Sequence, residues 1–285
     1  PANYIVAAGG ILLNESECAV EKEMKKFRTN TWKFKAENVH DFVWAADPDY
    51  EVITSQVKDG PLMKFYFQGN QPYAETWKQS TQLLTQAFEM LSSNYGKYPY
   101  PVYNFIQGGD GGMEYAMATL LAGPGLGTVF HEWIHSWYQH ILGTNESLFA
   151  WMDEGFTSYG EDDVTHHYEK NFATQSPYIS EAAKKQLTAS IERQATMLPT
   201  VQFGNYNGYL ALAKSGFEEP MSTHADHFIT NYAYSNAAYS KGGTFLGLLG
   251  YVMGEAKRDQ LMLNYYNTWK FKHPNANDFI RVAEK

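Results

Sequence analysis

Apolar positions near the start of the chain fall into short or alternating runs, the pattern of β-strands that bury one face. Turn-forming residues separate these runs. The first group of predicted strands covers 4–7, 10–13, 31–35 and 42–45. Four short strands make an incomplete β unit, so residues 1–56 are not expected to form a domain by themselves.

Beyond residue 50 the pattern mixes strands with longer segments of helical spacing. Further strands are predicted at 51–56, 62–68, 102–106 and 113–121. Helices are predicted at 73–95, 129–142, 152–168, 181–194, 237–253, 255–269 and 275–285. This succession predicts an α+β protein with a small sheet and a mostly helical remainder.

The predicted helix 129–142 is apolar nearly all round, so we expect it to be buried. Thr128 is its expected N-cap, and Gly143 is expected to end it. The same helix carries His131, Glu132 and His135. Polar groups without partners are costly in such a place, so these three residues need a function.

A zinc ion is the partner that suits these side chains. His131 and His135 are four residues apart, which places both imidazoles on one helix face. Glu132 points to another side and suits a role in proton transfer. Glu154, after 18 intervening residues, is the candidate third ligand, because catalytic zinc sites use three protein ligands. Alternatively, the H-E-x-x-H pattern is a coincidence, and Glu154 is only an acidic residue in the first turn of a helix, favoured by the helix dipole.

Several motifs together carry a family resemblance. H-E-x-x-H is followed by Glu154 in a W-x-x-E-G-F context. Residues 111–115 (GGMEY) resemble a G-x-M-E-N signature, and residues 239–242 (YSKG) resemble a Y-x-K-G segment. In this order, the motifs resemble those of the aminopeptidase N and leukotriene hydrolase family of zinc metallopeptidases. Residues 34–46 also look like the family's run into its catalytic domain.

The resemblance implies a fold and a domain organisation. It implies a thermolysin-like (gluzincin) catalytic domain with a small mixed sheet and a mostly helical remainder. Residues 57–285 would form this domain, and residues 1–56 would be the carboxyl-terminal part of an amino-terminal β domain. The chain would then be a fragment, and amino-terminal and carboxyl-terminal domains of a parent protein would be missing from it.

The resemblance also implies an activity, that of a zinc-dependent aminopeptidase with one Zn²⁺ per chain. His131, His135 and Glu154 would hold the zinc, Glu132 would handle protons, and Tyr239 would stabilise the oxyanion. The expected partner is a peptide substrate with a free amino terminus.

Glu114 would bind the α-ammonium group of the substrate, with Gly111, Gly112 and Met113 beside it in the substrate site. Tyr115 departs from the family pattern, in which Asn is usual. Glu161, seven residues after Glu154, is expected either to accept a hydrogen bond from a ligating histidine or to face solvent beside Asp162 and Asp163, which look solvated.

Composition narrows the remaining alternatives. A net charge of −9 argues against nucleic acid and anionic membranes as partners. The single Cys18 excludes an intrachain disulfide framework but does not fix the compartment, and no apolar run is long enough for a membrane span. Two alternatives stay open: a zinc endopeptidase of the thermolysin type, which does not need Glu114, and a non-catalytic interaction module.

Overall fold

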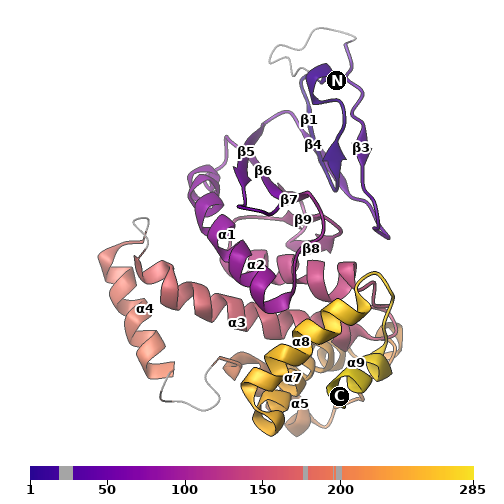
Figure 1. The fold of residues 1–285 in the computed structure, drawn as a ribbon. Helices are drawn as coiled ribbons and strands as arrows, with labels where there is room; N and C mark the ends of the chain where they lie inside the picture. Colours follow the sequence, from indigo (N-terminus) through magenta and orange to yellow (C-terminus); the bar gives the residue numbers. More distant parts are fainter. Residues whose placement is uncertain (19–27, 176–178, 195, 197–200) are drawn as a thin grey trace. The chain divides into compact units, whose positions relative to one another are not determined.

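Two units make up the chain in the computed structural model, which describes residues 1–18, 28–175, 179–194, 196 and 201–285 (Figure 1). Unit 1 comprises residues 1–89 and 97–136. Unit 2 comprises residues 90–96 and 137–285. Within the described part of the chain, no helix is long and apolar enough to cross a membrane.

A mixed five-stranded sheet forms the centre of unit 1. Its strands are β5 (Tyr50–Gln56), β6 (Leu62–Gln68), β7 (Val102–Gln107), β8 (Gly112–Tyr115) and β9 (Ala118–Leu121), in the order β5-β6-β7-β9-β8. The inner strands β6, β7 and β9 run parallel, and the edge strands β5 and β8 run antiparallel to their neighbours. Strand β7 is buried along its whole length, as expected for a central strand covered on both faces.

The structure corrects the prediction of one strand over 113–121. The segment forms a hairpin instead, in which Tyr115 of β8 pairs with Ala118 of β9. Met117 turns the chain with a positive φ of 63°. The turn carries neither glycine nor asparagine, the usual signals of such a conformation, and so the apolar sequence resembles one continuous strand.

Helices pack against one face of this sheet. Trp77 of α1 (Ala74–Tyr95) stacks on Phe67 of β6, with ring centroids 6.3 Å apart. Trp133 of α2 (Leu126–His135) meets Phe105 of β7 edge to face at 5.2 Å. Both tryptophans are fully buried, so aromatic packing holds these helices on the sheet.

The opposite face of the sheet packs against the amino-terminal strands. There β1 (Ile5–Ala8) pairs with β4 (Trp44–Asp47), and β2 (Ile11–Leu12) pairs with β3 (Phe34–Lys35). The shared core contains Ala7, Val43, Tyr50, Tyr66, Ile106 and Ala118. Strand β5, before the predicted domain boundary at residues 56 and 57, pairs with β6 beyond it, and that boundary stays a prediction.

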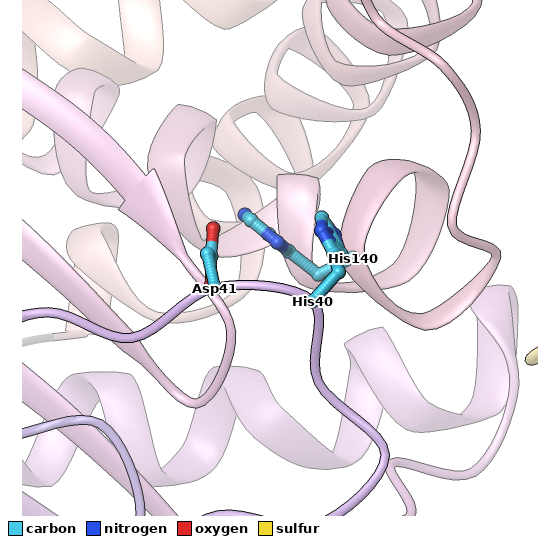
Figure 2. Close-up of side chains that lie close together, drawn as sticks. All are labelled: His40, Asp41 and His140. Carbon is cyan, nitrogen blue, oxygen red and sulfur yellow. The ribbon is translucent and has the colours of Figure 1, made fainter.

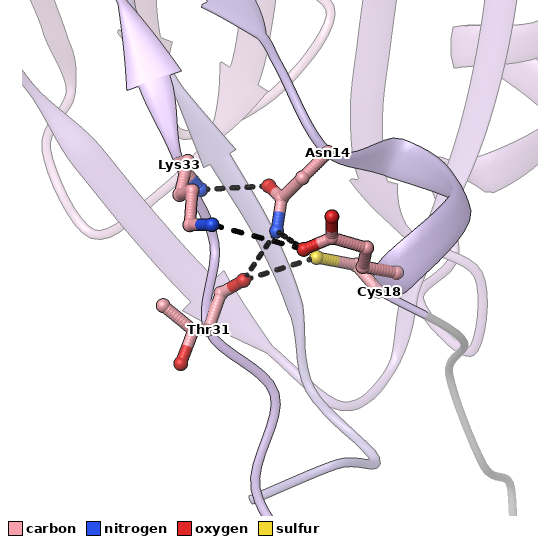
Figure 3. Close-up of polar contacts among 5 residues, drawn as sticks. Asn14, Cys18, Thr31 and Lys33 are labelled. Carbon is pink, nitrogen blue, oxygen red and sulfur yellow. Dashed lines mark hydrogen bonds and ion pairs between the residues drawn. The ribbon is translucent and has the colours of Figure 1, made fainter.

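Asn14 fastens the amino-terminal strands together (Figure 3). Its side-chain amide donates to the carbonyl of Thr31 at 2.8 Å, and the backbone amide of Lys33 donates to its Oδ1 at 2.9 Å. Cys18 is buried beside them, with its thiol donating to the Thr31 carbonyl at 3.3 Å. These contacts give the lone cysteine a structural setting.

Unit 2 is built from helices. They are α3 (Phe156–Asn171), α4 (Glu181–Gln194), α5 (Phe203–Ser215), α6 (Asn231–Ser235), α7 (Gly242–Met253), α8 (Glu255–Trp269) and α9 (Ala276–Ala283). Phe156 lies at the core, with ring centroids 5.2 Å from Tyr138, 5.9 Å from Tyr265 and 5.0 Å from Phe279. This aromatic cluster packs α3, α8 and α9 together, and the small sheet with a mostly helical remainder matches the predicted α+β class.

Three segments wind as π-helix, and each is continuous with a neighbouring α-helix: Ser136–Ile141, Trp151–Gly155 and Asn236–Lys241. Single π-helical turns occur often at functional sites. Two of these segments contain residues singled out by the sequence motifs, Glu154 and Tyr239.

Candidate metal centre

Helix α2 presents the first candidate ligands from a buried position. Its residues Val129, Phe130, Trp133 and Ile134 are fully buried, as the sequence predicts. The predicted N-cap is wrong: the helix begins at Leu126 after an extended Gly125, so Thr128 lies inside its first turn.

The predicted end of this helical segment is confirmed. Gly143 adopts a positive φ of 71°, and its amide donates to the carbonyl of Gln139. A glycine in this left-handed conformation is the usual way to end a helix.

His131 and His135 turn their imidazoles toward each other. Their Nε2 atoms lie 3.2 Å apart, and the ring centroids lie 4.9 Å apart. Two nitrogens that bind one zinc ion at ordinary bond lengths and a tetrahedral angle are separated by about 3.3 Å. The histidine pair therefore fits two positions of a tetrahedral zinc site.

Glu132 stands between the two histidines in the sequence and is buried, with only 7% of the residue exposed. Its Oε2 has no hydrogen-bond partner among the described residues. Burial raises the pKa of Glu132 to about 7, opposed by His135 and His131, while repulsion from Glu114 and a hydrogen bond with that carboxyl group raise it further. A hydrogen bond between two carboxyl groups requires that one of them carries a proton, which agrees with the raised pKa.

Gly112 lets strand β8 approach α2. A Cβ atom at this position would meet Glu132 Oε1 at 2.5 Å and Thr128 Cγ2 at 2.6 Å. Gly111 has open space around it, and Met113 is 38% exposed. Gly112 thus lets the backbone of β8 come close to α2, and β8 is an edge strand of the sheet.

Tyr115, the departure from the family pattern, has a structural setting. It packs against the core cluster that contains Ala7 and Val43. Neighbouring residues of a strand point to opposite faces, so Tyr115 and Glu114 serve different faces of the sheet. The change from Asn to Tyr therefore falls on the side of β8 that faces the amino-terminal strands.

In unit 2, Glu154 and Tyr239 form a short hydrogen bond. The Tyr239 hydroxyl donates to Glu154 Oε1 at 2.6 Å. Burial, together with the nearby Glu154 carboxylate, raises the pKa of Tyr239 far above its usual value. The phenol consequently stays protonated and remains a hydrogen-bond donor at neutral pH.

Two glycines make this contact possible. A Cβ atom on Gly155 would meet the Cα of Gly242 at 2.6 Å, and a Cβ atom on Gly242 would meet the Cα of Gly155 at 2.7 Å. The backbone after Glu154 and the backbone after Tyr239 therefore touch directly. Each glycine belongs to one of the two sequence motifs, but their contact could not be predicted from the sequence.

Glu161 lies half-buried on α3, and its predicted role beside a ligating histidine stays a prediction. The neighbouring Asp162 and Asp163 are not the solvated residues that the sequence predicts. Burial raises the pKa of Asp162 to about 7, and that carboxylate accepts a hydrogen bond from Asn205 at 2.9 Å. Burial also raises the pKa of Asp163, which accepts a hydrogen bond from Tyr95 at 3.1 Å.

Figure 2 labels other residues of metal-binding types. His40 and Asp41 are consecutive in the segment that leads to β4 of unit 1, and His140 belongs to the π-helical segment of unit 2. Asp41 Oδ1 accepts a hydrogen bond from the backbone amide of Ala116 at 3.2 Å. That bond gives Asp41 a structural role at the turn between β8 and β9.

Two curated proteins illustrate what this chain is similar to in sequence. The chain is similar to leucine aminopeptidase 2 of Yarrowia lipolytica, with 25% identity over 183 residues that cover 60% of this chain and 25% of that protein. It is also similar to a leukotriene A-4 hydrolase homolog of Botryotinia fuckeliana, with 24% identity over 188 residues that cover 59% of this chain and 24% of that protein. The chain thus spans about a quarter of the length of these curated relatives.

Solved structures show the same fold. An M1 zinc metallopeptidase from Deinococcus radiodurans superposes with a TM-score of 0.71 at 17% identity, covering 100% of this chain and 58% of that one. Yeast LTA4 hydrolase gives a TM-score of 0.65 at 17% identity, covering 98% of this chain and 41% of that one. A sequence profile of the peptidase family M1 domain matches residues 126–285, more than half of the chain, and the chain therefore belongs to peptidase family M1.

Proposed function

We propose that this chain carries the catalytic site of a zinc-dependent aminopeptidase, which hydrolyses the first peptide bond of a peptide with a free amino terminus. In this proposal His131, His135 and Glu154 hold one zinc ion per chain. Residues 57–285 form the catalytic domain. Because the chain spans only part of its relatives, the activity of the whole protein belongs to the proposal.

The histidine pair is the observation that carries the proposal. Its two Nε2 atoms, 3.2 Å apart, match the spacing of two nitrogen ligands on one zinc ion. The carboxylate of Glu154 completes a set of two nitrogens and one oxygen, which is the donor set of many catalytic zinc sites. A zinc ion bound there would act as a Lewis acid and make water more acidic.

Glu132 is the proton carrier in this proposal. It lies next to the first ligand in sequence and its carboxyl group is buried, with a pKa raised to about 7. A group with such a pKa can take a proton from the attacking water and give it to the leaving amine at neutral pH. Proton transfer of this kind contributes about 10²–10⁴-fold to the rate.

Tyr239 and Glu114 would position the substrate. The protonated phenol of Tyr239 is suited to donate to the oxyanion of the tetrahedral intermediate. Glu114, together with Gly111, Gly112 and Met113, would bind the substrate's amino terminus along the edge strand β8. Pairing of a peptide with an open sheet edge gives affinity through main-chain hydrogen bonds.

Hydrolysis of an aminoacyl-arylamide, with and without a chelator, tests the proposal. The wild-type chain should turn over the substrate, lose activity on chelation and regain it with zinc. Glu132→Gln should keep zinc, measured by metal analysis of the purified protein, and lose activity at least 100-fold, in line with the loss of about 10²–10⁴-fold expected for a proton-transfer group. Full turnover in Glu132→Gln would contradict the role of that carboxylate.

A second comparison separates the proposal from its alternatives. An aminopeptidase should cleave a free peptide and spare its N-acetylated form, whereas an endopeptidase of the thermolysin type should cleave both. A non-catalytic interaction module would bind no stoichiometric zinc and cleave neither.

A further inference from the structure

A cavity of about 500 Å³ lies within unit 2, between α3, α5, α7 and α8. This volume falls in the usual range of small-molecule sites, about 300–1,000 Å³. Gly247, Gly250 and Gly254 contribute backbone to the lining on the side of α7, and Tyr251 is the residue of α7 that contributes a side chain. All of the residues that line the cavity belong to unit 2, and none of them is one of the proposed catalytic residues.

Arg258 reaches into this cavity with a guanidinium group that is held in place. Its Cζ lies 5.0 Å from the ring centroid of Tyr159, and its Nε and Nη2 donate to Asp259 Oδ1 at 3.0 and 2.8 Å. The side chain is only 12% exposed. Three contacts to two neighbours therefore fix the plane of the guanidinium before any ligand arrives.

One nitrogen of Arg258 remains available. In the described part of the chain Nη1 makes no hydrogen bond, and it lies 2.5 Å from where a Cβ atom of Gly250 would be. The hydroxyl group of Tyr206 likewise has no hydrogen bond to the described residues, and it lies 3.3 Å from where a Cβ atom of Gly247 would be. The cavity thus offers hydrogen-bond donors, one of them charged, beside the glycines of α7, which suits a carboxylate.

The same cavity also offers negatively charged hydrogen-bond acceptors. Glu255 and Asp163 both line it. Glu255 precedes Arg258 by three residues on α8, so the two side chains start from one face of the helix, yet they form no ion pair. Arg258 pairs with Asp259 through Nε and Nη2, which leaves Nη1 and the Glu255 carboxylate to face the cavity, and groups of opposite charge in one cavity suit a ligand that carries both signs.

From these contacts we propose that the cavity binds a free α-amino acid. Arg258 Nη1 and the Tyr206 hydroxyl bind its carboxylate, Glu255 and Asp163 bind its ammonium group, and Tyr159 and Val201 contact its side chain. The two charges of an α-amino acid are attached to one carbon, and residues three apart on a helix have Cβ atoms about 5–6 Å apart, which suits a ligand of this size. The inference stands apart from the proposed function, although a peptidase acting at amino termini would release ligands of this class.

Isothermal titration calorimetry on the full metal-loaded chain tests the proposal with three related probes. L-phenylalanine carries both charges, 3-phenylpropionate lacks the ammonium group, and 2-phenylethylamine lacks the carboxylate. L-phenylalanine should bind saturably, with a dissociation constant about tenfold lower than that of either other probe. This is the ratio expected when one charge-assisted hydrogen bond is lost. Equal binding of 2-phenylethylamine would overturn the proposed ligand class.

Variants place the binding site. Arg258→Met should weaken L-phenylalanine binding at least tenfold, and Glu255→Gln should weaken it while leaving 3-phenylpropionate unchanged. Lys257→Gln, an exposed neighbour on α8 that also removes one positive charge, should bind as the wild type does.

Gly247→Ala is a second variant in case Arg258→Met fails to fold. The atoms nearest to its new methyl group belong to the Tyr206 and Gln202 side chains, at 3.3 Å or more. Gly247→Ala should also weaken binding. His135→Ala should leave the affinity unchanged, so loss of binding in His135→Ala with retention in Arg258→Met would place the amino acid at the metal centre and refute this site. Absence of saturable L-phenylalanine binding up to its solubility limit would refute it as well.

Discussion

The contact between Gly155 and Gly242 offers the sharpest test of how the proposed site is built. In Gly155→Ala, the new Cβ atom would lie 2.6 Å from the Cα of Gly242 and 2.9 Å from the carbonyl oxygen of Ala238. Ordinary carbon contacts lie at about 3.5–4.0 Å, so one backbone must move by about 1 Å. No side chain can rotate to relieve the clash, because the nearest atoms all belong to the main chain.

A movement of that size would break the contact between Tyr239 and Glu154. Their hydrogen bond of 2.6 Å would lengthen to about 3.6 Å, beyond hydrogen-bond range. We expect the free energy of unfolding to fall by about 1–3 kcal/mol, the usual effect of overpacking. We expect kcat/KM for an aminoacyl-arylamide to fall by about 10²-fold, as for a misplacement of about 1 Å in a catalytic site.

The assays are urea unfolding, zinc content and arylamide hydrolysis on the same preparations. Gly204→Ala is the matched control, since a Cβ atom at this position on α5 would meet nothing within 4 Å. Its stability should be unchanged or slightly raised, because alanine favours a helix more than glycine does. Wild-type stability and activity in Gly155→Ala would refute the close approach of the two segments.

Three further predictions concern single side chains. Tyr239→Phe should keep zinc and lose about 10²–10³-fold in kcat, the usual effect of removing one oxyanion donor, and unchanged kcat would contradict that role. Glu114→Ala should lower kcat/KM for peptides with a free amino terminus at least tenfold, and unchanged kcat/KM on these peptides would count against ammonium binding. Burial raises the pKa of Asp162 from its ordinary value of 3.8 to about 7 in the folded state. The protonated carboxyl group therefore contributes its whole stabilisation below about pH 4, and this stabilisation is lost as the pH rises through 7. In urea unfolding, Asp162→Asn should therefore be more stable than wild type at about pH 8 but not at about pH 4. The gain should be well under the linkage limit of about 4 kcal/mol, because the side chain is partly exposed and accepts a hydrogen bond from Asn205. A stability difference that does not depend on pH would refute this prediction.

Local patterns predicted most of the secondary structure. Strand β6 and helix α8 have the predicted bounds, and Gly143 ends its helix as expected, because periodicity and end signals lie within a few residues of each other. The errors fall where local signals are weak. The turn at Met117 has no usual turn residue, and the helix of His131 begins at Leu126 without any side-chain cap.

The residues of the site differ in how far sequence could assign them. The spacing of His131 and His135 predicts that their side chains share a helix face, and the measured 3.2 Å between their Nε2 atoms agrees with that. The carboxyl contact between Glu114 and Glu132 joins residues 18 apart on a strand and a helix, and no local pattern announces it. The solvated setting predicted for Asp162 is wrong because packing against Asn205, 43 residues later, buries that carboxylate.

The sequence by itself determined the ordered motifs of this protein, its α+β class and the family to which it belongs. Such information is local, since side-chain type and spacing along a helix or strand depend on neighbours in the chain. Only the tertiary structure decided that Gly155 touches Gly242, that Tyr239 donates to Glu154, and that Arg258 faces a cavity. These contacts join segments far apart in the sequence, and close packing rather than periodicity selects them.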